Sequence, residues 1–179
     1  KVRYIGTSNF GLDLLDACER IRHVDTFQPE LNLLVRGAAA TILPWCEANG
    51  TGVIVYSPMR SGLLGGRYTR ERAESLPDDD WRSTHPDFQE PGLGTNLIVV
   101  ERLRTIATEL GCTLPELAVA WALAWPAVDG AIVGARRPSQ LDDWIGAGAV
   151  ELDDDRLDEI AALLEETGAG VGPTRPGAA

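Results

Sequence analysis

Short apolar runs alternate with longer amphipathic segments along this chain. Four runs rich in β-branched or small apolar residues predict buried strands, at residues 2–6, 25–28, 53–56 and 131–134. Elsewhere apolar residues recur at three- and four-residue spacing, which predicts helices. We place these helices at residues 12–21, 38–49, 96–110, 114–125, 138–147 and 153–166. Residues 64–95 break the alternation with scattered Gly, Pro and Asp, and they predict a long loop over the strand ends.

The repeated strand–helix order predicts an α/β fold with a parallel sheet. A (β/α)8 TIM barrel needs about 250 residues, so four units correspond to about half of one. The competing doubly wound sheet needs a Gly-x-Gly-x-x-Gly fingerprint, but residues 7–10 read Thr-Ser-Asn-Phe at that place. We therefore expect a single partial barrel domain over residues 1–166 and a tail over residues 167–179. Because Lys1 opens directly into an apolar run, we also expect the chain to start within a larger fold.

Charge and composition narrow the classes of partner. The 179 residues carry a formal net charge of −11 and no basic run longer than Arg136-Arg137, so we expect no nucleic-acid partner. The longest apolar stretch, residues 117–128, is broken by Pro126 and is shorter than the roughly 20 residues that span a bilayer, so we expect no membrane partner. The three cysteines lack paired spacing, which favours free thiols, no metal site and a cytoplasmic location.

The last two predicted strands end in loops suited to an anion. Residues 57–66 are rich in Ser and Gly, so their backbone N–H groups can approach a phosphate closely. Arg136 and Arg137 precede Pro138, which begins a predicted helix. Two guanidinium groups beside a helix N-terminus fit a phosphate monoester, although a surface Arg pair in an acidic protein remains the alternative.

The first three predicted strands end in aromatic and neutral polar groups. Tyr56 could stack on a planar ring or simply close the edge of the core. Ser8, Asn9 and Gln28 suit a carboxamide better than a charged group. A ring, an amide and a distal phosphate together are the parts of a nicotinamide dinucleotide.

Four motifs in order resemble the aldo-keto reductases, closest to their bacterial general-stress branch. They are Gly-Thr-Ser-Asn-Phe at 6–10, Gln-Pro-Glu-Leu-Asn at 28–32, Tyr-Ser-Pro-Met with Gly-Leu-Leu-Gly-Gly at 56–66, and Gly-Ala-Arg-Arg-Pro-Ser-Gln-Leu at 134–141. The resemblance implies the C-terminal half, strands 5–8, of a (β/α)8 barrel. It also implies an oxidoreductase that reduces aldehydes and ketones to alcohols with NADP(H).

The resemblance assigns cofactor-binding roles residue by residue. Ser8, Asn9 and Gln28 would hold the nicotinamide carboxamide, and Tyr56 would stack on the ring. The pyrophosphate would be wrapped by Ser57, Pro58, Met59, Arg60, Ser61 and Gly62. The adenosine would be bordered by Gly134, Arg136, Gln140 and Asp143, with Arg136 or Arg137 nearest the 2′-phosphate. Trp144 stands where many relatives have an Asn that contacts adenine.

The family's catalytic Asp, Tyr, Lys and His do not occur in matching positions, so we assign no catalytic residue. Catalysis on a small-molecule carbonyl substrate would then belong to the intact protein, with a missing N-terminal half as partner, and this fragment alone would be inactive. One alternative is a non-catalytic NADP(H)-binding or regulatory module similar to the β subunits of potassium channels. Another is a half-barrel that pairs with a copy of itself, because an open half exposes strand edges.

Overall fold

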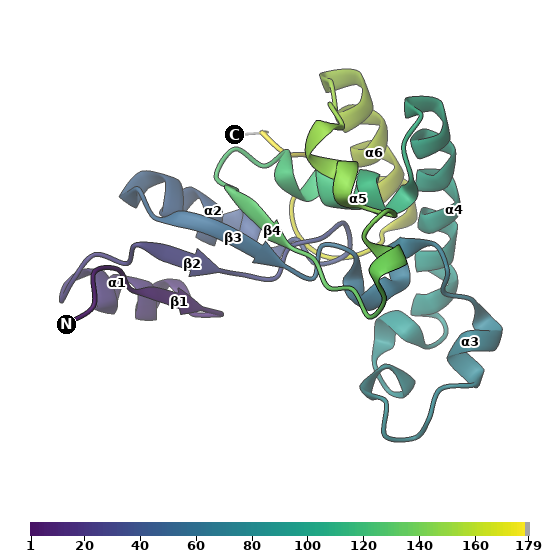
Figure 1. Ribbon diagram of the computed structural model, residues 1–179, viewed down its shortest axis with the longest axis horizontal. Helices are drawn as coiled ribbons and strands as arrows, with labels where there is room; N and C mark the ends of the chain where they lie inside the picture. Colours follow the sequence, from purple (N-terminus) through teal and green to yellow (C-terminus); the bar gives the residue numbers. More distant parts are fainter. Residues whose placement is uncertain (178–179) are drawn as a thin grey trace.

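A four-stranded parallel sheet organises the chain in the computed structural model, which describes residues 1–177. The strand order is β1-β2-β3-β4, so each strand pairs with the next one in sequence (Figure 1). The strands are β1 (Gly6–Ser8), β2 (Thr26–Gln28), β3 (Gly52–Tyr56) and β4 (Gly130–Ile132). The pairing register places Ser8 beside Gln28 and Tyr56 beside Ile132. The predicted parallel α/β arrangement is confirmed.

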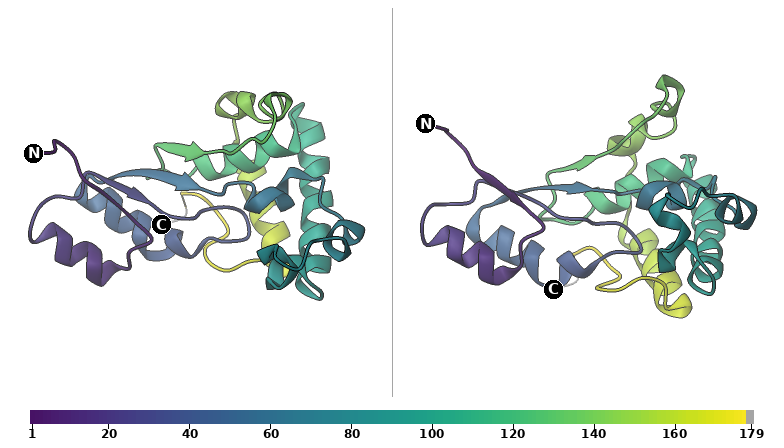
Figure 2. Two further views of the ribbon diagram at one scale, coloured as in Figure 1. Left: turned by 60° about the horizontal axis from the view of Figure 1, so that its bottom comes forward. Right: turned by 90° about the horizontal axis from the view of Figure 1, so that it is seen from below.

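The described residues form six α-helices, which surround the sheet unevenly. They are α1 (Leu12–Glu19), α2 (Gly37–Asn49), α3 (Arg70–Glu74), α4 (Gly92–Leu110), α5 (Leu114–Leu123) and α6 (Asp154–Thr167). In both views of Figure 2, α1 and α2 lie together on one face of the sheet. The indole N–H of Trp45 joins them by donating to Asp16 at 2.7 Å. Figure 1 shows α4, α5 and α6 grouped beyond β4, on the opposite side of the molecule from β1.

Burial along the strands alternates, because successive side chains of a strand point to opposite faces. Phe27, Val53 and Val55 are buried under the helices. On the other face Ile54 and Ile132 remain 40% and 45% exposed. The sheet is therefore covered on one side and open on the other.

The expected barrel position of these strands is wrong. Within residues 1–177 the sheet is open, with β1 at one edge and β4 at the other. Counting strand–helix units predicts parallel pairing, but it fixes neither closure nor the rank of a strand within a closed fold.

Two segments differ from their predicted secondary structure. Residues 138–147 do not form one helix, but two short 3-10 turns at Pro138–Gln140 and Ile145–Ala149. Gly146 and Gly148 lower the helix propensity of the second. Residues 64–95 are not a plain loop, since they include α3 and 3-10 turns at Trp81–Ser83 and Pro86–Phe88.

The segment after α6 packs back onto the start of α2. Val171 forms a bridge with Val35, and Arg36 is only 2% exposed. The Arg36 guanidinium donates to the carbonyls of Ala169 and Gly172 at 3.1 and 3.3 Å, and also to that of Leu33. The tail predicted over residues 167–179 thus begins within the last turn of α6, and its final two residues lie outside the described part of the chain.

Candidate functional site

The carboxyl ends of β1, β2 and β3 are tied to one another by polar side chains. Ser8 Oγ donates to the Gln28 carbonyl at 2.9 Å, and the Tyr56 hydroxyl donates to Asn9 Oδ1 at 3.0 Å. Parallel strands bring their carboxyl ends to one edge of a sheet, which is where α/β proteins bind ligands. The structure therefore brings Ser8, Asn9, Gln28 and Tyr56 together, while their role in holding a carboxamide and ring stays a prediction.

The loop after β3 is held in an unusual backbone conformation. Ser57, Arg60 and Ser61 have positive φ angles of 59°, 44° and 50°, and Asn9 after β1 has a φ of 59°. Non-glycine residues seldom adopt this region, and such strain concentrates at functional sites. Asn32 supports the loop by donating from Nδ2 to the Ser57 carbonyl at 3.1 Å.

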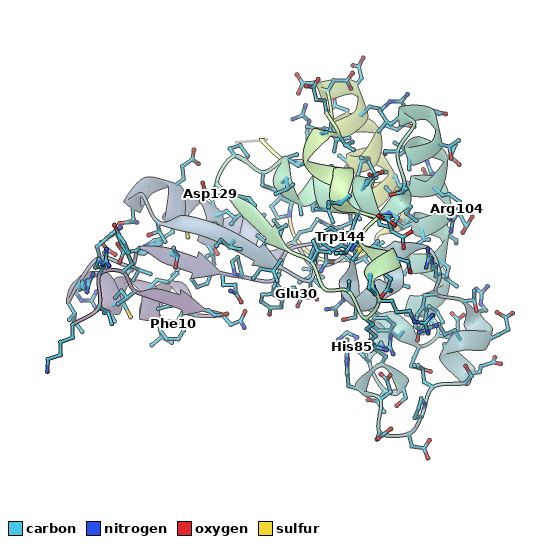
Figure 3. All side chains as sticks on the ribbon, viewed as in Figure 1. Phe10, Glu30, His85, Arg104, Asp129 and Trp144 are labelled. Atoms are coloured by element: carbon cyan, nitrogen blue, oxygen red, sulfur yellow. The ribbon has the colours of Figure 1, made fainter. Side chains whose placement is uncertain are left out.

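Arg60 points away from the other predicted pyrophosphate-binding residues. Its side chain is 9% exposed and pairs with Glu30 at 2.6 Å and Asp87 at 2.7 Å. Arg60 Nη2 also lies 3.2 Å from His85 Nε2; Figure 3 labels Glu30 and His85. Arg60 lines neither of the cavities described below. Its place is structural, because it joins the end of β2 to the 64–95 segment.

The loop after β4 is shaped by Gln140. Its Oε1 accepts hydrogen bonds from the backbone N–H of Arg136 at 2.7 Å and of Arg137 at 3.0 Å. Both arginine residues are exposed, and both line the cavity described below. Arg67 Nη2 bonds both carboxylate oxygens of Asp143, at 2.9 and 3.0 Å.

Two adjoining cavities lie between the loops that follow β3 and β4. The smaller, here called the arginine cavity, has a volume of about 340 Å³ and includes Arg67, Tyr68, Arg72, Arg82, Arg137, Asp143 and Trp144 in its wall. The larger, here called the strand-end cavity, has a volume of about 890 Å³ and includes Tyr56, Ser57, Pro58 and Asp80. The two share eight wall residues: Met59, Ser61, Gly62, Arg72, Arg82, Gly134, Arg136 and Gln140. Of the predicted residues, Ser8, Asn9, Gln28 and Arg60 reach neither wall.

The arginine cavity concentrates positive charge in an acidic protein. Five guanidinium groups contribute to its wall, and two of them are neutralised, Arg67 by Asp143 and Arg82 by Asp80. Within residues 1–177, Arg72, Arg136 and Arg137 have no ion-pair partner within 4.0 Å. A concave surface with three uncompensated guanidinium groups attracts an anion.

The 64–95 segment supplies wall residues that the sequence analysis did not single out as ligands. Arg67, Tyr68, Arg72 and Arg82 all come from it. A signal was available, because these cations interrupt an otherwise acidic segment. The aspartate of the Asp80-Trp81-Arg82 triplet accepts two charge-assisted bonds from Arg82, at 2.6 and 2.9 Å. Those bonds lower the pKa of Asp80 to about 2.

Among residues 1–177 no three His, Cys, Asp or Glu side chains are grouped so that they could hold a metal ion. In the same part of the chain, no individual helix has both the length and the apolar character needed to cross a bilayer.

A parallel α/β fold whose strand-end loops enclose a cationic cavity agrees with the comparison with known families. Residues 1–165 match the aldo/keto reductase family, so the chain belongs to that family, as its motifs predicted. Aldo-keto reductase YhdN of Bacillus subtilis is 34% identical over 168 residues, and probable aldo-keto reductase 1 of Glycine max is 33% identical over 160 residues. The structure of the glycerol dehydrogenase AKR11B4 from Gluconobacter oxydans is similar, with a TM-score of 0.88 and 30% identity.

The extent of these matches bears on the predicted fold. The family match runs from residue 1 to residue 165, which overturns the assignment of this chain to strands 5–8 of a barrel. The matches cover 93%, 89% and 97% of this chain, and 50%, 45% and 52% of YhdN, the Glycine max protein and the glycerol dehydrogenase. The chain thus spans about half the length of the relatives it matches.

Proposed function

We propose that this chain provides the NADP(H)-binding site of an oxidoreductase that reduces aldehydes or ketones to alcohols. The observation that carries the proposal is the arginine cavity, where loops after two neighbouring strands meet around three guanidinium groups without a carboxylate partner. A phosphate monoester fits that charge, and the adjoining strand-end cavity gives room for the rest of a dinucleotide.

Each part of the cofactor has residues whose chemistry fits it. Arg136 and Arg137 would hold the 2′-phosphate, and the loop from Ser57 to Gly62 would follow the pyrophosphate, with Arg60 turned away. Tyr56 would cover the nicotinamide ring, beside the amide and hydroxyl groups at the ends of β1 and β2. When bound, NADPH supplies the hydride that reduces a carbonyl carbon.

Direct titration tests the cofactor proposal. Tryptophan fluorescence of the full chain, titrated with NADPH and then with NADH, should show tighter binding of NADPH. Replacing Arg136 and Arg137 with Met together should bring the two affinities to within a few-fold. Arg102→Met is the matched control, since Arg102 is an exposed arginine paired with Glu166 away from both cavities. Equal affinity of the unaltered chain for NADPH and NADH would refute a 2′-phosphate site.

A non-catalytic NADP(H)-binding module is the second candidate. Such a module would bind the cofactor in the same two cavities without reducing a carbonyl substrate. NADPH oxidation in the presence of a nitrobenzaldehyde separates the two candidates. Sustained, carbonyl-dependent loss of absorbance at the NADPH band supports the reductase, and tight binding without turnover supports the module.

A further inference from the structure

Unsatisfied polar groups gather at the arginine cavity. Among residues 1–177 five buried side-chain polar atoms have no hydrogen-bond partner, and two of them belong to wall residues of this cavity, Tyr68 and Trp144. The other three, on Thr7, Trp121 and Trp125, line neither cavity. Buried polar groups are nearly always paired, so the unpaired hydroxyl of a residue that lines a cavity points to a ligand that supplies the partner when it binds.

Tyr68 is held firmly in its place. It is 4% exposed, and its ring packs edge-to-face on Phe88 with centroids 5.1 Å apart. The guanidinium carbons of Arg72 and Arg82 lie 6.0 and 5.9 Å from the ring centroid. Burial raises the pKa of the Tyr68 hydroxyl, with Asp80 acting in the same direction and the two arginines opposing it. The hydroxyl is therefore protonated at neutral pH and is available as a donor.

The charged side chains around the Tyr68 hydroxyl favour an anion as the acceptor of its hydrogen bond. Arg82 is already committed to Asp80 at 2.6 Å, whereas Arg72 is exposed and has no ion-pair partner within 4.0 Å among residues 1–177. An anion entering the cavity can draw Arg72 toward itself and at the same time accept a bond from Tyr68. A phosphate oxygen is such an acceptor, because it can take bonds from a hydroxyl and a guanidinium together.

We infer that the Tyr68 hydroxyl donates a hydrogen bond to a phosphate monoester bound in the arginine cavity and thereby helps to select the phosphorylated dinucleotide. The inference rests on the proposed NADP(H) site and adds to it a residue from the 64–95 segment. It also gives a role to a hydroxyl at a position where Phe would fill the same space without a buried unpaired group.

Tyr68→Phe tests the inference because it removes only the hydroxyl. The full chain and this variant are titrated with NADPH and NADH by calorimetry and by tryptophan fluorescence. We expect the variant to bind NADPH about tenfold more weakly, as loss of a hydrogen bond to a charged group implies. Its affinity for NADH should stay within about twofold of the unaltered chain, and its melting temperature without ligand should be no lower.

A matched control is available at Thr7, whose buried hydroxyl is also unpaired but lies outside both cavities. Thr7→Val deletes that hydroxyl at nearly constant shape, and it should leave both dinucleotide affinities unchanged. A selective loss of NADPH affinity in Tyr68→Phe, but not in Thr7→Val, supports the inference. Equal losses for NADPH and NADH, or no loss at all, overturn it and leave the cofactor proposal standing.

Adenosine 2′-monophosphate and adenosine differ only by the phosphate, so a comparison of the two tests the Tyr68 inference separately from the proposed NADP(H) site. If the unaltered chain binds neither dinucleotide, the proposed function fails, and thermal shifts with these two smaller probes still report on Tyr68. A shift with the monophosphate that is present in the unaltered chain and reduced in Tyr68→Phe supports the inference. A shift of the same size in both proteins overturns it.

Discussion

Replacing Arg60 with Met should cost the protein about 3 kcal/mol of unfolding free energy. The substitution keeps the length of the side chain but removes the cation that lies between Glu30 and Asp87. Breaking a buried ion pair from one side costs about 3–5 kcal/mol, because the remaining charge is left without a partner. We take the lower end, since the carboxylate side chains of Glu30 and Asp87 are 23% and 28% exposed and keep part of their hydration.

Urea denaturation followed by circular dichroism measures this loss at constant m-value. For a chain of this length it corresponds to a fall in melting temperature of about 6–12 °C. Arg102→Met is the control, because the Arg102 and Glu166 side chains are 47% and 68% exposed and such a surface pair is worth at most about 1 kcal/mol. A loss in Arg60→Met no larger than that of the control would refute the assignment of Arg60 to a structural network.

Three further predictions concern single groups. Hydrogen bonds from Arg82 lower the pKa of Asp80 from 3.8 to about 2. The ionised carboxylate therefore stabilises the fold fully above pH 3.8, and this stabilisation is lost as the pH falls toward 2. Urea unfolding curves of Asp80→Asn and of the unaltered chain should accordingly converge in acid. Burial raises the pKa of Cys46 to about 11, so dithionitrobenzoate at about pH 8 should label it only after unfolding, and labelling of the native chain would contradict its buried position. Arg36→Met removes the guanidinium donors to residues 168–177, and limited proteolysis should then cut that segment faster than in the unaltered chain.

Five of the six α-helices could be predicted well because their signals are local, whereas α3 and the turns at 138–149 were not. Apolar periodicity placed α2 and α4 close to their observed bounds, and it placed the start of α5 at residue 114, where the structure has a capping box between Thr113 and Glu116. The Gly50 backbone adopts a φ of 69°, as expected of a residue that ends a helix. Local hydrogen bonding and spacing are sufficient for such elements.

The edge strand was harder to place. The apolar run at residues 2–6 predicted a strand, but β1 covers Gly6–Ser8, and Val2 and Tyr4 are 65% and 75% exposed. At a sheet edge, burial no longer decides which residues pair, so an apolar pattern loses its meaning there. Because closure depends on how the edge strands pair, the apolar pattern could not indicate whether the sheet closes either.

The candidate site was predictable only in part. Residues after β3 and β4 could be found because each follows directly on a strand, and parallel strands bring such loops together. Tyr68, Arg72 and Arg82 were harder to find, since their position depends on the path of a segment without strong periodicity, and only the basic residues within an acidic stretch gave a signal. Arg60 lies in the same predicted loop, but its side chain pairs with the partly buried carboxylates of Glu30 and Asp87, which the sequence pattern did not indicate.

The contact between Arg36 and residues 169–172 spans almost the whole sequence, and this affects synthesis of the chain. The acceptors of a buried guanidinium near the start of α2 are among the last described residues to leave the ribosome. Until they emerge, a charged group of the nascent chain lacks its permanent partners, so the region around α2 stays incompletely packed. Translation that stops shortly after α6 should therefore leave a polypeptide that chaperones retain, even though every strand and helix of residues 1–177 has already been made.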